Sequence, residues 1–184
     1  YRQLQELVRG TLDDMGFGTE SWEINAAELE EFPGSGVNPT RDMSNMPVVV
    51  GRLAGAGQGR SLILNGHYDV VPPGLTDNWR HDPFVAVVED GKVFGRGACD
   101  MKGGIAAMIM ALRAIQGAGI ELAGDVIVQT VPDEEATSMG TLACCQRGYR
   151  ADAAIIPEPT DMKVLVAMRG GLYGRITVFG RAGH

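Results

Sequence analysis

The sequence predicts an α/β protein in which a mostly parallel sheet is covered by helices on both faces. Segments rich in β-branched and aromatic residues alternate along the chain with segments of helical character, which is the pattern of parallel strands joined by crossover helices. Polar residues also follow directly after four of the predicted strands. Parallel sheets bind ligands beyond the carboxyl ends of their strands, so the second observation supports the first.

The first predicted element is an amphipathic helix at the N-terminus, because apolar residues recur at helical spacing from Leu4 to Met15 and Gly16 follows as a stop signal. Residues 18–46 predict irregular chain with room for one edge strand. The β-prone runs predict strands over 47–53, 61–65, 84–88, 92–94, 125–131, 151–156, 164–168 and 171–179. Glu89-Asp90-Gly91 predicts a hairpin turn between two of them. Helices are predicted over 103–115 and 137–147.

The charge and the cysteines exclude several classes of protein. The net charge is −7 and there is no basic run, so we expect neither nucleic acid nor an anionic membrane surface as a partner. No apolar stretch is long enough to cross a bilayer. The three cysteines, Cys99, Cys144 and Cys145, form no CxxC pair and predict neither a disulfide framework nor a thiolate zinc site. We therefore expect packing cysteines in a reducing compartment and a cytoplasmic protein.

Four strand ends carry the residues that suggest chemistry. They are His67 and Asp69 after 61–65, Asp100 after 92–94, Glu134 and Glu135 after 125–131, and Glu158 after 151–156. If the strands are parallel neighbours, these carboxylates and one imidazole meet in one crevice, where like charges repel. Divalent cations relieve this repulsion, and two of them would balance most of the negative charge. Imidazole and carboxylate together suit Zn²⁺ best, with Co²⁺ or Mn²⁺ as alternatives.

Local geometry suggests how these residues divide their roles. His67 and Asp69 are two apart in extended chain and share a face, so Asp69 can accept a hydrogen bond from the ring nitrogen that does not bind metal. Glu134 and Glu135 are adjacent and point in different directions, so one can bind a metal while the other acts as a general base. Asp100 lies centrally and can bridge two ions.

Each residue taken alone also has an ordinary explanation. A single histidine such as His67 is more often a surface or hydrogen-bonded residue than a ligand. Asp69 or Glu158 at a strand end can be a helix cap or a loop residue. Residues 133–135 can form the acidic first turn of a helix. The combination of all of them at four strand ends is what favours a metal site.

The same segments resemble a known family. Residues 63–72 (ILNGHYDVVP), 95–104 (GRGACDMKGG), 132–135 (PDEE) and 157–160 (PEPT) resemble the cocatalytic-zinc amidohydrolases. That family includes acetylornithine deacetylase, succinyl-diaminopimelate desuccinylase, aminoacylase and carboxypeptidase G. The resemblance covers nearly the whole chain and implies a zinc-exopeptidase-like fold.

The resemblance also implies a role for each site residue. His67 and Glu158 would bind one zinc ion, Glu135 would bind the second, and Asp100 would bridge the two. Glu134 would be the general base, and Asp69 would orient His67. The Asp100–Met101 peptide would be cis. His184 would help to hold the substrate.

The chain departs from the family pattern towards its end. The family takes another histidine for the second zinc ion from the C-terminal part of the catalytic domain. The remaining histidine here, His81, is no candidate for it, because the sequence around His81 predicts a structural turn. Residues 1–168 would then be the N-terminal part of a metal-binding catalytic domain. Residues 169–184 would begin an inserted lid or dimerisation domain with its first strand. The resemblance thus implies an intact chain roughly twice as long, which forms a homodimer.

The implied function is metal-dependent hydrolysis of the amide bond of a small-molecule N-acyl amino acid, as in the deacetylase and desuccinylase branch. Two alternatives stay open. The protein could be a dipeptidase or carboxypeptidase of the same family, acting on a short peptide. These 184 residues alone could also act as a non-catalytic metal-binding module.

Overall fold

A computed structural model describes residues 1–29, 37–38, 40–168, 170–171, 176–181 and 183. The described chain is organised around a five-stranded sheet in the order β1-β2-β6-β3-β7. The strands span Gly18–Trp22 (β1), Val48–Leu53 (β2), Leu62–His67 (β3), Val126–Val131 (β6) and Ala153–Ile155 (β7).

Four of the five strands point the same way. β3 pairs in parallel with β6 on one side and with β7 on the other, while β2 is antiparallel to both β6 and β1. The register places His67 opposite Val131, so β3 and β6 end at the same edge of the sheet. The predicted α/β class and its mostly parallel sheet are therefore confirmed, and the parallel part of the sheet carries the site.

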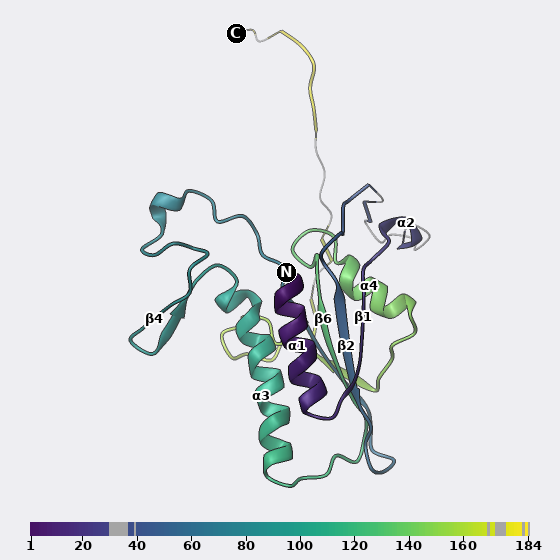
Figure 1. The fold of residues 1–184 in the computed structure, drawn as a ribbon. Helices are drawn as coiled ribbons and strands as arrows, with labels where there is room; N and C mark the ends of the chain where they lie inside the picture. Colours follow the sequence, from purple (N-terminus) through teal and green to yellow (C-terminus); the bar gives the residue numbers. More distant parts are fainter. Residues whose placement is uncertain (30–36, 39, 169, 172–175, 182, 184) are drawn as a thin grey trace.

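Helices cover both faces of the sheet (Figure 1). On one face lie α1 (Arg2–Asp14) and α3 (Gly103–Gly117), and on the other lie α2 (Ala26–Leu29) and α4 (Met139–Gln146). All six residues of β6 are buried, as expected for a central strand with both faces covered. Alternate residues feed two cores, with Leu64 and Val128 facing α1 and α3 while Ile127 and Val131 face α4.

The predicted hairpin is present and stands away from the main sheet (Figure 1). Its strands are β4 (Val87–Glu89) and β5 (Lys92–Phe94), which pair antiparallel. Asp90 and Gly91 both have positive φ, at 49° and 71°, which is the backbone of the two-residue turn that Asp-Gly favours. Among the described helices, none combines the length and apolar character needed to cross a bilayer.

Several sequence predictions differ from the structure. The strand predicted over 92–94 was expected to end beside the other site strands as a parallel neighbour, but it pairs antiparallel with β4 in a separate sheet. The strand predicted over 164–168 is wrong, because these residues form no strand and are exposed; no described strand lies alongside to supply the hydrogen-bonded partner that a strand needs. The strand predicted over 171–179 falls partly outside the described residues, and the described part, 171 and 176–179, is irregular. The structure also adds the short helix α2, which Asn25 caps through the N–H of Ala27 at 3.2 Å.

Candidate metal centre

His67 lies at the end of β3 and contacts most of the other site residues. Its side chain is 1% exposed, and Asp69, 5% exposed, lies immediately beyond the strand. Gly66 allows the strand to approach α3 closely here, since a Cβ at this position would lie 2.8 Å from Cγ1 of Ile105. Tyr68 points to the α1 and α3 side and donates its hydroxyl to the carbonyl of Pro47 at 2.9 Å. The imidazole is therefore held on a rigid strand end.

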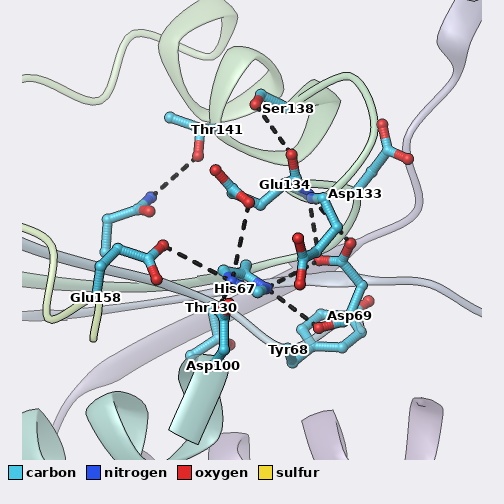
Figure 2. A network of polar contacts seen from close by, with 12 residues as sticks. His67, Tyr68, Asp69, Asp100, Thr130, Asp133, Glu134, Ser138, Thr141 and Glu158 are labelled. Carbon is cyan, nitrogen blue, oxygen red and sulfur yellow. Dashed lines mark hydrogen bonds and ion pairs between the residues drawn. The ribbon is translucent and has the colours of Figure 1, made fainter. Parts of the chain in front are cut away.

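The two ring nitrogens of His67 face different partners (Figure 2). Nε2 lies 3.0 Å from Oδ1 of Asp100, 3.7 Å from Oε1 of Glu158 and 3.9 Å from Oε2 of Glu134. Nδ1 lies 3.4 Å from Oδ1 of Asp69 and 3.1 Å from its backbone carbonyl oxygen. One nitrogen is thus turned to a group of carboxylates and the other is held by a single aspartate, as expected of a histidine that binds metal.

Asp69 also fixes the chain that carries the two glutamates. One oxygen of its carboxylate accepts the backbone N–H of Glu134 at 3.2 Å, and the other accepts that of Glu135 at 3.3 Å. This contact joins the end of β3 to the turn that follows β6. Asp69 therefore orients the imidazole of His67 and the backbone of both glutamates at once.

Asp100 enters the site from an irregular turn, Ala98–Lys102, just before α3. The Asp100–Met101 peptide is cis, as the resemblance implied, and Met101 is fully buried beneath the site. Gly97, with φ of 78°, begins the turn, and a Cβ there would lie 2.4 Å from Cγ1 of Val70. The turn therefore needs glycine at this position.

The structure brings together the six acidic and imidazole residues predicted from the sequence. Oxygen and nitrogen atoms of His67, Glu134 and Glu158 lie within 4.8 Å of one another, and so do those of His67, Asp100 and Glu135. This donor set of one imidazole and hard carboxylates fits Zn²⁺, Co²⁺ or Mn²⁺. The residues present therefore fit a divalent metal, while the number of ions and the ligand of each remain predictions.

The electrostatics of the site agree with a set of metal ligands. Burial lowers the pKa of His67, but Asp69, Asp100 and Glu158 outweigh burial and raise it to about 9. Burial raises the pKa of Glu158 to about 7, with the nearby carboxylates adding to the effect and His67 opposing it. Burial likewise raises the pKa of Glu134. Without metal, protons therefore occupy part of the site at neutral pH.

Asp69 behaves in the opposite way. Burial alone would raise the pKa of its carboxyl, but hydrogen bonds from His67 and from the N–H groups of Glu134 and Glu135 lower it below its usual range. Asp69 therefore stays ionised, as a group that orients the others must.

His81 lies apart from this centre. Nε2 of His81 lies 3.1 Å from Oε2 of Glu89, and its ring packs against Phe94, so it joins its loop to the hairpin. His184, predicted to hold substrate, lies outside the described residues. Cys144 is buried in the core on the α4 side, whereas Cys145 and Cys99 are exposed, so only one of the three cysteines serves packing.

Sequence reasoning gave no role to two further charged residues near the site. Lys102 is half-buried close to Asp69 and Asp100, and burial lowers its pKa against the opposing effect of these two carboxylates. Asp133 is fully buried and paired with Arg41. A signal for Asp133 exists in the sequence, because three consecutive acids cannot all point into one crevice.

Curated proteins share much of this sequence. The chain is 40% identical over 163 residues to N-formyl-4-amino-5-aminomethyl-2-methylpyrimidine deformylase of Bacillus subtilis, covering 88% of this chain and 34% of that protein. It is 42% identical over 140 residues to succinyl-diaminopimelate desuccinylase of Leptothrix cholodnii, covering 71% of this chain and 37% of that protein. The chain thus spans about a third of the length of these curated relatives.

Solved structures share the fold. Human carnosine dipeptidase 1 matches with a TM-score of 0.62 at 24% identity, over 84% of this chain and 32% of that chain. The M20 family metallo-carboxypeptidase Sso-CP2 of Sulfolobus solfataricus matches with a TM-score of 0.53 at 27% identity, over 60% of this chain and 26% of that chain. The family model for peptidase family M20/M25/M40 matches residues 63–171, more than half of the sequence, and the chain therefore belongs to this family.

Proposed function

We propose that the intact protein containing this chain is a metal-dependent amidohydrolase that cleaves the amide bond of a small N-acylated amine or amino acid. The observation that carries the proposal is the arrangement around His67, where Nε2 faces three carboxylates while Asp69 holds Nδ1. Membership of the M20/M25/M40 family supports the same reaction class.

His67, Asp100, Glu135 and Glu158 are the residues that we expect to hold metal, with Zn²⁺ as the first choice. When bound, two such ions supply Lewis-acid activation of water and of the scissile carbonyl. Asp69 keeps His67 in the tautomer that leaves Nε2 free for a ligand bond.

Glu134 is the residue that we propose as general base. Its carboxylate lies beside the other acids, and the resemblance assigns the ligand roles to its neighbours and the role of base to Glu134. Burial raises its pKa above the usual value, which favours taking up a proton. It would accept a proton from the attacking water and then pass it to the leaving nitrogen. The products would be a free amine and a small carboxylic acid.

The names of the relatives guide the choice of acyl group. The Leptothrix cholodnii relative is named a desuccinylase, in line with the deacetylase and desuccinylase branch expected from the sequence. The Bacillus subtilis relative is named a deformylase, so N-formyl compounds join the candidates. A second candidate is hydrolysis of short peptides, which the similarity to the metallo-carboxypeptidase Sso-CP2 favours.

We further propose that residues 169–184 begin a lid or dimerisation domain and that His184 serves the substrate from there. The intact protein would then be a homodimer. The match covers 34% and 37% of these relatives, so they are long enough to hold a further domain.

The test is an assay of the intact, zinc-loaded protein against matched N-formyl, N-acetyl and N-succinyl amines and against dipeptides. We expect turnover of an N-acyl compound, and a loss of about 10²–10⁴-fold in kcat in Glu134→Ala with zinc content unchanged. Wild-type turnover in Glu134→Ala would refute the role of Glu134. Bound zinc without turnover of any compound would favour a non-catalytic metal-binding module, and turnover of dipeptides alone would favour the peptidase.

A further inference from the structure

The turn that carries Glu134 and Glu135 depends on Asp133, the residue just before them. Asp133 is fully buried and has a φ of 68°, a backbone conformation that non-glycine residues seldom adopt. It follows Pro132, directly after the end of β6. Figure 2 shows it beside Glu134, on the side away from Glu158. The backbone direction at Asp133 thus decides where both glutamates point.

Asp133 closes this turn with its own atoms. Its carbonyl oxygen accepts the N–H of Thr137 at 3.2 Å and that of Ser138 at 2.6 Å, and its carboxylate accepts the hydroxyl of Thr137. Asp69 holds the N–H groups of Glu134 and Glu135 from the other side. Two aspartates therefore fix the chain from 133 to 138. Asp69 holds its first part through the N–H groups of residues 134 and 135, and Asp133 holds its last part through those of residues 137 and 138.

The charge of Asp133 is paired by a residue from a distant part of the sequence. Arg41, in the loop between α2 and β2, forms an ion pair with the Asp133 carboxylate. This loop is itself anchored, because Met43 is buried in the core on the α4 side with Val131 and Met139. A fully buried carboxylate is costly unless it is paired, so the conformation of the turn depends on Arg41.

We propose that Arg41 is a positioning residue for the metal centre, acting through its ion pair with Asp133. It touches none of the reacting atoms. It holds Asp133 in the conformation that directs Glu134 and Glu135 to separate positions around His67, so that one can serve as base and the other as ligand. The inference rests on the proposed function for the roles of the two glutamates.

The test compares four variants of the intact protein: Arg41→Met, Arg41→Lys, the double variant Arg41→Met/Asp133→Asn, and a control. The control is Arg52→Met, which breaks a second Arg–Asp pair, between Arg52 and Asp125 with Nε 3.1 Å from Oδ2. That pair joins the last residues of β2 to the residue just before β6. It lies at the edge of the sheet opposite the site. The readouts are kcat and KM, and the visible absorption spectrum of the Co²⁺-substituted protein.

We expect Arg41→Met to lower kcat on the order of 10–100-fold with little change in KM, and to shift the Co²⁺ absorption bands. Arg41→Lys should recover part of both, because it restores the charge. Arg52→Met should match the wild type in both.

The double variant removes the two charges together while keeping the shape of Asp133, so it stays informative if Arg41→Met alone fails to fold. We expect it to lose kcat and to shift the bands as well. A double variant with wild-type kcat and spectrum would overturn the proposal, and so would an equal loss in Arg52→Met. If no N-acyl compound is turned over, the proposed function fails, and the Co²⁺ spectrum still reports whether Arg41 positions the metal centre.

Discussion

His67 links the chemistry of the site to the sheet at the scale of single residues. Its Nε2 lies within 4 Å of three carboxylates that come from three different segments of the chain. Its Nδ1 is held by Asp69, which is two residues away. A protein without metal can keep so many acids around one imidazole only by taking up protons, which is what the raised pKa values of His67 and Glu158 describe.

These pKa values predict that metal binding releases protons. Without metal, His67 with a pKa of about 9 holds a proton at pH 7, and Glu158 with a pKa of about 7 is half-protonated. Metal ligands must be deprotonated, so metal affinity should rise with pH up to about pH 9 and then level off. Calorimetric titration with zinc at pH 7, in two buffers of different ionisation enthalpy, measures the protons released. Equal apparent enthalpies in both buffers would contradict the prediction.

Asp69→Asn tests the residue that orients the others. An amide offers one acceptor oxygen in place of two, so it cannot hold His67 and the N–H groups of both glutamates as the carboxylate does. We expect zinc affinity to fall on the order of 10–100-fold, measured by competition with a chelator. Asp152→Asn is the control, because Asp152 accepts the N–H of Ser61 at 2.7 Å just before β3 begins, far from the site. An unchanged affinity in Asp69→Asn would remove its supporting role.

The sequence could predict five of the six site residues because they lie at or soon after the ends of β3, β6 and β7, which are parallel neighbours. Asp100 is different, because it follows the antiparallel hairpin strand β5 and reaches the site through the Ala98–Lys102 turn, so only the resemblance indicated its place. The sequence also predicted that Asp69 supports His67, which follows from the two-residue period of extended chain. The pairing of Arg41 with Asp133 could not be predicted in this way. The two residues are 92 positions apart in the sequence. Their contact also depends on the positive φ at Asp133, which no local sequence pattern indicates.

At the scale of elements, the contact between α4 and the end of β6 controls the site. Gly140 lies in the first turn of α4, and a Cβ there would lie 2.3 Å from the carbonyl oxygen of Pro132 and 2.7 Å from Cβ of Val131. The helix can therefore lie directly against the strand that leads into Glu134 and Glu135. This approach leaves little room for adjustment, because the nearest atom is a backbone oxygen and the next two are Cβ of Val131 and a ring carbon of Pro132.

Two glycine-to-alanine substitutions should have opposite effects for this reason. Gly140→Ala should lower the free energy of unfolding by about 1–3 kcal/mol, as overpacking does. Gly10→Ala should raise it by roughly 0.5–1 kcal/mol, because Gly10 lies inside α1 with nothing within 4 Å of its added Cβ and alanine favours the helix. Urea unfolding of the two variants checks both signs. A stabilising Gly140→Ala would show that α4 can move away from β6.

The elements that the sequence predicted well are those whose pattern is local. The hairpin follows from Asp90-Gly91, and α1 and α3 follow from apolar spacing and composition. The strand predicted over 164–168 has the same β-prone composition as β6, yet it forms no strand in the described structure. Composition gives a segment its preference, whereas a strand also needs a neighbour, and no pattern within the segment supplies one.

At the scale of the whole molecule, the predicted metal ligands come from several separate elements around the parallel part of the sheet. β3 and β6 end at the same edge, the Ala98–Lys102 turn reaches it from α3, and Glu158 follows β7. No single element holds enough of these residues to bind a metal. The fold must be complete before the ligands meet, so metal binding and folding stability should be linked.

Removal of the metal should therefore destabilise the intact protein. A ligand that binds only the folded state stabilises it by about 2.7 kcal/mol when its free concentration is 100 times Kd. We expect a chelator to lower Tm and abolish turnover, and added Zn²⁺ to restore both. Glu135→Gln, which replaces a predicted ligand, should make Tm less sensitive to metal, because the folded state then binds the metal more weakly. A Tm that does not respond to chelator or zinc in the wild type would mean that the carboxylates around His67 hold no metal, and protonation alone would then have to keep them together.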